Sequence, residues 1–394
     1  MVNLLARAKE LQGEMIAWRR HLHALPEIGD NLPQTTQFVR AKLEEFGYSP
    51  VEISPGSIIA EISGTNTGNC IMLREDMDAL PIKEDTNLPF KSDNGYMHAC
   101  GHDIHTSVLL GCARILRENA GLLRGTVRLL FQADEETLNG ANAVIAAGGL
   151  NGVDAAVTLH VDALSPWNLG ALTMAKPGVI LASCDHYRID ITGKGGHGAY
   201  PNQTIDPINV GSHIHLALQE IMSRELGASD AAVLTQGIFH AGEAANIIPH
   251  NAYMEGTLRT YDEKIRRMCL ERMGGICENV ARAFRAEAAV TVLGSCASFL
   301  NDESLFLSVE RYLKEIVGEE GYVREGDAGV AFASEDFANV SRLVPAVQIC
   351  LILGGETDGC SIPMHHPQVV FAEAPVYIGA AALAHTAIRY LQEV

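Results

Sequence analysis

The chain is short of positive charge. Its 29 lysines and arginines face 48 aspartates and glutamates, which leaves a formal net charge of -19 at pH 7. Such a field repels polyanions and argues against nucleic acid and anionic membrane surfaces as partners. The chain also lacks any run near the roughly 18 consecutive apolar residues of a membrane span. These absences favour a small molecule as the ligand.

A regular cysteine framework is also missing. The nine cysteines are an odd number without regular spacing, so we expect no disulfide scaffold. The first residues, Met1 to Arg7, lack the basic region, apolar core and small-residue cleavage site of a secretory signal. Together these features predict a cytoplasmic protein.

The composition is that of a folded globular protein, with 47% hydrophobic and 20% charged residues. A chain of 394 residues is too long for one compact core and suits two domains. Strand-like runs at 57–62, 69–73, 126–131 and 154–159 alternate with helical patterns such as 105–116. This alternation predicts an α/β domain built on a mostly parallel sheet.

The pattern changes between residues 184 and 295. The expected elements there are strand 185–191, helix 204–222, strands 231–239 and 252–259, helix 262–286 and strand 289–293. That βαββαβ order is typical of a split βαβ, or ferredoxin-like, sandwich. We therefore predict a catalytic domain made of residues 1–183 and 296–394, with an inserted ferredoxin-like domain at 184–295.

Potential metal ligands are concentrated between Met97 and His105. This stretch combines a thiol, three imidazoles and a carboxylate, namely Cys100, His98, His102, His105 and Asp103. Such side chains suit a transition metal. Taken alone, Cys100 is better explained as a buried structural cysteine, but the ligands around it favour a metal site.

Three further places supply ligand candidates. Glu135 and Glu136 follow one predicted strand and His160 follows another, and sites in parallel sheets form beyond the carboxyl ends of the strands. One glutamate can bind metal while the other acts as general base. The alternatives are a hydrated loop for the glutamates, a core position for His160 and a surface turn for His365 and His366. We predict that these places and the Cys100 stretch converge on a dinuclear metal site.

Two aspartates, Asp76 and Asp78, follow the predicted strand 69–73 at positions i and i+2. On an extended chain their side chains share one face. They either orient a metal ligand or belong to a solvated strand end, and the residues alone leave both interpretations open.

Motifs run in order through nearly the whole chain. They are Arg20-His21-Leu22-His23-x-x-Pro26-Glu27, Arg74-x-Asp76-Met77-Asp78-Ala79-Leu80-Pro81, Met97 to Thr106, Phe131-Gln132-x-x-Glu135-Glu136, Gly193-x-Gly195-Gly196-His197, Asn246-Ile247-Ile248-Pro249, Gly256-Thr257-Leu258-Arg259, Ser334-Glu335-Asp336-Phe337 and His365-x-Pro367. This set resembles the amidohydrolase branch of the aminoacylase and carboxypeptidase metallopeptidase family. That branch includes auxin-conjugate hydrolases, hippurate hydrolases and N-acetyl-amino-acid deacetylases.

The resemblance implies a metal-dependent amidohydrolase that cleaves the amide bond of N-acyl amino acids. It implies two divalent metals per subunit, such as Zn, Mn, Co or Ni, with the Cys100 thiolate between them; their ligands are Cys100, His102, Glu136, His160 and His365. Glu135 is then the general base that takes a proton from the bridging water. Three aspartates are expected to orient the ligand side chains without binding metal themselves, namely Asp76, Asp78 and Asp103.

For the inserted domain, the resemblance implies a lid that also forms a homodimer. His197 on this lid is expected to reach the partner subunit's site and stabilise the oxyanion. Asn246 and Arg259 are expected to hold the α-carboxylate of the substrate, a task that suits a guanidinium.

The chain departs from the family pattern at several positions without losing a proposed ligand. Glu75 stands where a small residue is common, and His366 replaces Ser or Asn. Ala133-Asp134 replaces the frequent Pro-Ala before the glutamates, so Asp134 adds negative charge beside Glu135.

Three other functions compete with the N-acyl amidohydrolase. The chain could be a non-catalytic metal-binding homologue, or a dipeptidase-like hydrolase of the same family. It could also be a thiol hydrolase with Cys100 as nucleophile and His98 or His102 as base. The thiol mechanism leaves Glu136, His160 and His365 without a role.

Overall fold

The computed structural model describes residues 3–64, 68–355 and 362–393. Its contacts divide the chain into two compact units. Unit 1 comprises Met1–Ile180, Leu300–Val330 and Glu335–Val394, and unit 2 comprises Leu181–Phe299 and Ala331–Ser334. The inserted domain predicted from the sequence spans residues 184–295. Each unit is described by itself.

Unit 1 is built on an eight-stranded sheet in the order β1-β2-β4-β3-β5-β16-β6-β15. The strands are β1 (Val51–Ser54), β2 (Ser57–Ser63), β3 (Cys70–Asp76), β4 (Thr126–Gln132), β5 (Ala155–Asp162), β6 (Leu172–Met174), β15 (Tyr322–Arg324) and β16 (Ala346–Ile352). The central neighbours β4, β3, β5 and β16 run parallel, whereas β1, β2 and the β16–β6 pair are antiparallel. The predicted mostly parallel central sheet is confirmed.

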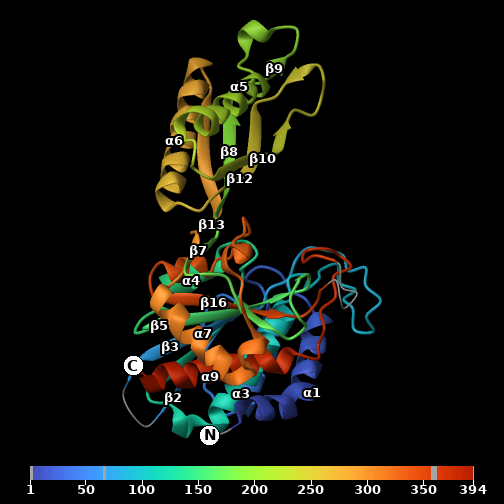
Figure 1. Ribbon diagram of the computed structural model, residues 1–394. Helices are drawn as coiled ribbons and strands as arrows, with labels where there is room; N and C mark the ends of the chain where they lie inside the picture. The colour runs from blue at the N-terminus through green and yellow to red at the C-terminus, as the bar shows by residue number, and fades with distance from the viewer. Residues whose placement is uncertain (1–2, 65–67, 356–361, 394) are drawn as a thin grey trace. The chain divides into compact units, whose positions relative to one another are not determined.

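Helices cover both faces of this sheet. They are α1 (Leu4–His23), α2 (Pro33–Glu45), α3 (His102–Glu118), α4 (Gly140–Ala146), α7 (Glu303–Val317), α8 (Ala338–Ser341) and α9 (Val376–Glu393). α1, α3 and α9 pack against one another (Figure 1). All seven residues of β3 are buried, as expected for a strand covered on both faces.

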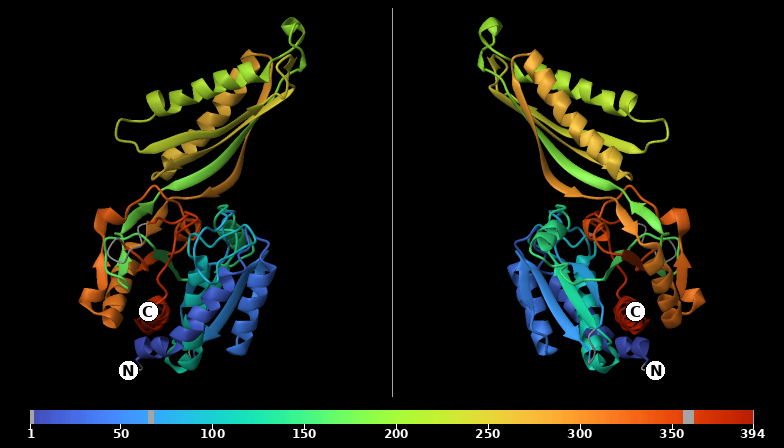
Figure 2. Two further views of the ribbon diagram at one scale, coloured as in Figure 1. Left: turned by 90° about the vertical axis from the view of Figure 1, so that its right-hand side faces the viewer. Right: turned by 90° about the vertical axis from the view of Figure 1, so that its left-hand side faces the viewer.

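Unit 2 holds a four-stranded antiparallel sheet in the order β10-β12-β8-β13. Its elements in chain order are β8 (Ser183–Thr192), α5 (Pro207–Glu220), β10 (Ala232–Ala241), β12 (Asn251–Thr260), α6 (Glu263–Ala283) and β13 (Glu287–Cys296). Alternate residues of β8 are buried. Figure 2 shows both helices on one face of this sheet.

Short elements complete the two units. The strands β9 (Gly196–His197) and β11 (Ile247–Ile248) form one small ladder, and β7 (Gly178–Leu181) and β14 (Phe299–Asn301) form another. Tight 3₁₀ turns lie at Ala120–Leu122, Pro201–Gln203, Glu319–Gly321 and Gly326–Gly329, and a π-helical turn at Ile221–Glu225 continues α5.

Two predicted boundaries need correction. The helix expected at 105–116 begins earlier, at His102, and the strand expected at 154–159 continues to Asp162. His160 therefore lies within a strand rather than just after it. The eight cysteines in the described part of the chain are free, and Cys360 lies outside that part. Among the helices of the described residues, none has the length and apolar character needed to cross a membrane.

Candidate metal centre

The turn before α3 carries the first two ligand candidates. Gly101 has a φ of 95°, and a Cβ atom built on it would lie 2.5 Å from Val161 Cγ2, so both conformation and space require glycine. The turn places Cys100 just before the helix and His102 in its first turn. Both residues are buried.

The two glutamates follow β4 in a tight turn. It begins at Asp134, which has a φ of 64°, a left-handed conformation that aspartate tolerates better than most residues. The carboxylate of Asp78 then accepts hydrogen bonds from both following amides, from Glu135 N at 3.0 Å and from Glu136 N at 3.1 Å. One buried aspartate thus fixes the backbone of both glutamates.

The remaining two ligand candidates are histidines from β5 and from the C-terminal part of the chain. His160 Nδ1 lies 2.7 Å from Val161 O, which leaves Nε2 facing Cys100 Sγ at 3.6 Å. His365 has a φ of 62°, and its amide donates to Ala99 O at 2.9 Å. Its Nε2 atom lies 3.5 Å from Glu136 Oε1.

These side chains form two groups that share one sulfur atom. The ligand atoms of Cys100, His102 and His160 lie within 4.8 Å of one another, and so do those of Cys100, Glu136 and His365. Two ligands of one zinc ion can be no more than about 4.4 Å apart, given Zn–S and Zn–N bonds of about 2.3 and 2.1 Å. The separations of 3.5 Å between His365 Nε2 and Glu136 Oε1 and of 3.6 Å between Cys100 Sγ and His160 Nε2 fit this limit.

The chemistry of the donors also fits a cation. Among the described residues, His102 Nε2 and Glu136 Oε1 are buried and have no hydrogen-bond partner. Burial raises the pKa of Glu136 to about 7, and burial followed by Glu136 raises the pKa of the Cys100 thiol well above its usual value. These acids lack compensating positive charge, which bound metal ions would supply.

The two aspartates left open by the sequence are both buried. The backbone oxygen of Asp78, rather than its carboxylate, accepts from His102 Nδ1 at 2.8 Å and leaves Nε2 free for a metal. Asp76 Oδ1 lies 2.6 Å from His105 Nδ1. The solvated strand end is therefore wrong for this pair.

Asp103 belongs to a second buried group, on the α1 side of α3. Its Oδ2 atom accepts from Arg19 Nε at 2.8 Å and lies 2.8 Å from His23 Nδ1. Burial alone would raise the pKa of Asp103, but Arg19 and His23 hold it well below its usual value. Asp103 thus ties the first turn of α3 to α1.

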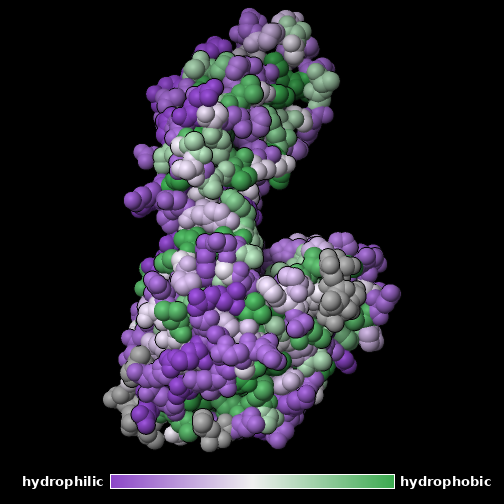
Figure 3. Space-filling view, in the orientation of Figure 1, coloured by the Kyte–Doolittle hydropathy of each residue, from purple (hydrophilic) through white to green (hydrophobic). Residues whose placement is uncertain are grey.

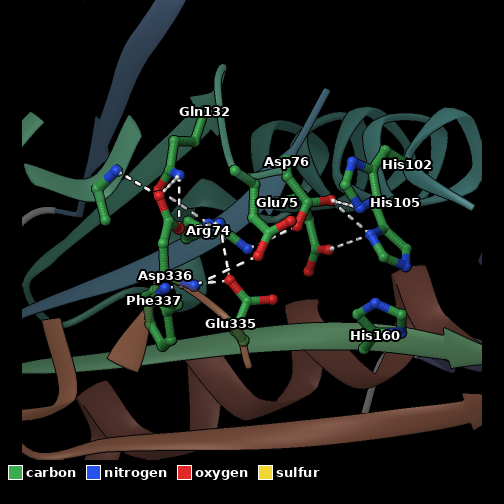
Figure 4. A network of polar contacts seen from close by, with 12 residues as sticks. Arg74, Glu75, Asp76, His102, His105, Gln132, His160, Glu335, Asp336 and Phe337 are labelled. Atoms are coloured by element: carbon green, nitrogen blue, oxygen red, sulfur yellow. Dashed lines mark hydrogen bonds and ion pairs between the residues drawn. The ribbon is translucent and has the colours of Figure 1, made fainter. Parts of the chain in front are cut away.

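A network of carboxylates surrounds the fully buried Arg74 and was not predicted from the sequence (Figure 4). Its guanidinium pairs with Asp76 at 2.7 Å, Asp336 at 2.8 Å and Glu335 at 3.0 Å. Asp336 N also donates to Glu135 Oε1 at 3.3 Å. The sequence signal for this network was the pair of motifs that contain Arg74 and Asp336. Neither motif by itself indicates that the two residues pair.

The other three predicted site residues lie in unit 2. His197 and Asn246 are exposed neighbours, since β9 pairs with β11 and Gly198 N donates to Asn246 O at 2.9 Å. Arg259 lies near the opposite end of β12 and donates to Phe332 O at 3.0 Å. The eight residue-to-residue steps from Asn251 to Arg259 span roughly 26 Å of strand.

Known proteins match this chain over nearly its whole length. The profile of the peptidase family M20/M25/M40 matches residues 72–389. An N-acetyl-L-cysteine deacetylase of Bacillus subtilis (strain 168) is 35% identical over 385 residues, which cover 97% of this chain and 89% of the relative. A hippurate hydrolase of Campylobacter jejuni is 34% identical over 394 residues, covering 99% and 100%. A solved Bacillus subtilis structure, described as a dinuclear metal binding peptidase from the M20 family, is 32% identical with a TM-score of 0.78 and covers 98% and 100%.

Proposed function

The chain belongs to the peptidase family M20/M25/M40, and on this basis we propose that it is a metal-dependent amidohydrolase that cleaves the amide bond of N-acyl amino acids. The observation that carries the proposal is the sharing of Cys100 between two groups of ligand atoms. One thiolate placed between two groups suits a dinuclear site. In this assignment Cys100, His102, Glu136, His160 and His365 hold the two ions.

Glu135 is the proposed general base. It lies next to the ligand Glu136, its backbone is fixed by Asp78, and its Oε1 atom faces the amide of Asp336. Bound divalent ions would polarise the amide carbonyl and lower the pKa of a bound water. Glu135 accepts the proton of the attacking water and passes it to the leaving amine.

We propose that unit 2 is a ferredoxin-like lid, because its strand and helix order is βαββαβ. His197 would stabilise the oxyanion, and Asn246 and Arg259 would hold the substrate carboxylate. Since Asn246 and Arg259 lie toward opposite ends of β12, one lid cannot present both to one small carboxylate. A second copy of the chain, which supplies His197 and Asn246 in trans, resolves this separation.

The surface of unit 2 supports such a homodimer. β10 lies at the edge of its sheet, next to β12. It exposes Val233, Ile238 and Phe239, and α5 exposes Leu216 at 67%. Figure 3 shows hydrophobic side chains that reach the surface of this unit. An open strand edge beside apolar side chains is a suitable surface for pairing with a second copy.

The reaction is tested with metal-stripped protein and a panel of N-acetyl, N-benzoyl and indole-acetyl amino acids, with dipeptides as a further arm. Zinc, manganese, cobalt and nickel are added one at a time. We expect metal-dependent release of amino acid from the N-acyl compounds. Cleavage of dipeptides alone would favour the dipeptidase alternative. Two bound metals without turnover would favour the non-catalytic one, and activity that ignores chelation but is lost on alkylation would favour a Cys100 nucleophile.

The role in trans is tested by mixing two inactive variants, Glu135→Gln and His197→Ala. A mixed dimer holds one site with both an intact Glu135 and a partner lid with an intact histidine. Random exchange should therefore restore about a quarter of the wild-type activity. No recovery, despite exchange shown by mass spectrometry of labelled chains, would refute action in trans.

A cytoplasmic location stays a prediction of the sequence.

A further inference from the structure

Close to His160, β5 is no longer paired with β3. The ladder between β3 and β5 ends at the pair Arg74–Thr158. β3 nevertheless stays paired with β4 as far as Asp76, and β5 stays paired with β16 as far as Asp162. The end of β5, which carries a proposed metal ligand, therefore has no backbone partner on its β3 side.

Two side chains replace the missing backbone. The amide of Leu159 donates to Glu75 Oε1 at 2.9 Å, and the amide of Val161 donates to His105 Nε2 at 3.0 Å. Alternate residues of a strand turn their amides to the same side. Leu159 and Val161 thus carry the two amides that face β3 beyond the end of the ladder, and His160 lies between them.

The ring of His105 is fixed in one state by this arrangement. Its Nε2 atom accepts a hydrogen bond and therefore carries no proton, so Nδ1 is the nitrogen that donates to Asp76 Oδ1 at 2.6 Å. Both ring nitrogens are used, which leaves none for a metal. His105 serves the centre through the strand it holds.

Glu75 is the less expected member of the pair. Its side chain is fully buried, and Oε2 has no hydrogen-bond partner among the described residues. Oε2 lies 4.0 Å from His105 Nδ1, and Figure 4 shows the two side chains in the same region as His160. Glu75 belongs to none of the groups of metal-ligand atoms found within 4.8 Å of one another in the described chain. In the described part of the chain, the hydrogen bond that Glu75 makes is the one from the amide of Leu159.

We propose that Glu75 is a positioning residue that, together with His105, holds the segment of β5 carrying His160 and so fixes one ligand of the metal pair. This inference rests on the proposed function. A buried polar group is costly unless it is hydrogen-bonded, and the Leu159 amide is the partner that Glu75 has. Burial raises the pKa of Glu75 well above its usual value. The oxygen that accepts from Leu159 is the atom that the proposal needs, and glutamine can supply an oxygen at the same place.

The test measures cobalt binding to the full-length protein. Glu75→Gln keeps an oxygen acceptor in place, whereas Glu75→Met removes it at similar volume. We expect Glu75→Gln to bind both cobalt ions as the wild type does. Glu75→Met should weaken one of the two ions by about 10- to 100-fold and shift the cobalt–thiolate absorption band of Cys100. His105→Leu, which breaks the bond to Val161, should weaken the same ion.

Asp154→Ala is the matched control. Asp154 Oδ2 accepts from the amide of Cys70 at 2.7 Å and so links the same two strands at their other end. Its loss should lower the unfolding temperature but leave both cobalt affinities unchanged. The proposal is overturned if Glu75→Met and His105→Leu bind both ions normally, or if Glu75→Gln is as weak as Glu75→Met. Wild-type protein without a cobalt pair would instead refute the proposed function.

Discussion

Replacing Asp78 with asparagine should weaken metal binding while leaving the size of the side chain unchanged. The two carboxylate oxygens of Asp78 accept the amides of Glu135 and Glu136, one each. Asparagine offers one oxygen and turns an NH₂ group toward the second amide. The variant therefore loses one hydrogen bond to a charged acceptor and leaves a buried N–H group unpaired.

The size of the effect follows from this geometry. A hydrogen bond to a charged group contributes about 1.5–3 kcal/mol. If the glutamate turn relaxes when metal is absent, the loss falls on the metal-bound state. At about 1.4 kcal/mol per tenfold, Asp78→Asn should weaken metal affinity by about 10- to 150-fold. Because Glu136 belongs to only one of the two ligand groups around Cys100, we expect one ion to be affected more than the other.

The assay is competition for zinc between the protein and a chromogenic chelator, with unfolding temperatures recorded with and without metal. Asp302→Asn is the matched control, because Asp302 accepts the amide of Leu305 at the start of α7 and asparagine is an equally good helix cap. Wild-type affinity of both ions in Asp78→Asn would refute the view that Asp78 positions the glutamates.

Three further outcomes are expected. Glu135→Gln should lower kcat by about 10²- to 10⁴-fold with unchanged metal content by elemental analysis, and retained turnover would exclude Glu135 as the base. Chelation followed by peroxide should inactivate the protein through oxidation of Cys100, detected by mass spectrometry, and full recovery on adding metal would count against Cys100 as a ligand. The pKa of Asp103 is lower in the folded than in the unfolded chain, so its stabilising effect is present above about pH 4 and lost as the pH falls further. Unfolding temperatures of Asp103→Asn should therefore depend less on pH in this acid range than those of the wild type, and equal slopes would contradict the assignment.

The sequence could predict that the candidate ligands converge, because several of them lie in short local patterns. Cys100 and His102 share one turn, and Glu135 and Glu136 directly follow a strand. Parallel strands bring their carboxyl ends to one edge of a sheet, so local patterns far apart in the chain meet there. The boundary at His160 was wrong because a polar residue in an apolar run suggests an end, whereas β5 continues there by pairing with β16.

The supporting groups could not be predicted in the same way. Arg74 and Asp336 are 262 residues apart, and each by itself is an ordinary charged residue beside a strand or loop. Glu75 stood out only as a departure from the family pattern. Its role depends on where the β3–β5 ladder stops, and that register is a property of the folded sheet.

The buried carboxylates of the candidate metal centre differ in their ion-pair partners from those around Arg74 and Arg19. Arg74 pairs with Asp76, Glu335 and Asp336, and Arg19 pairs with Asp103, so each of these carboxylates has an arginine partner. The ion pairs of Glu136 in the described chain are instead with His102 and His365, two imidazoles that are themselves candidate ligands. Removing metal should therefore leave the network around Arg74 intact and loosen the contacts between Cys100, Glu136 and His365. Hydrogen exchange that increases in the turns carrying these residues, but not in β3, is the outcome that this distribution of charge requires.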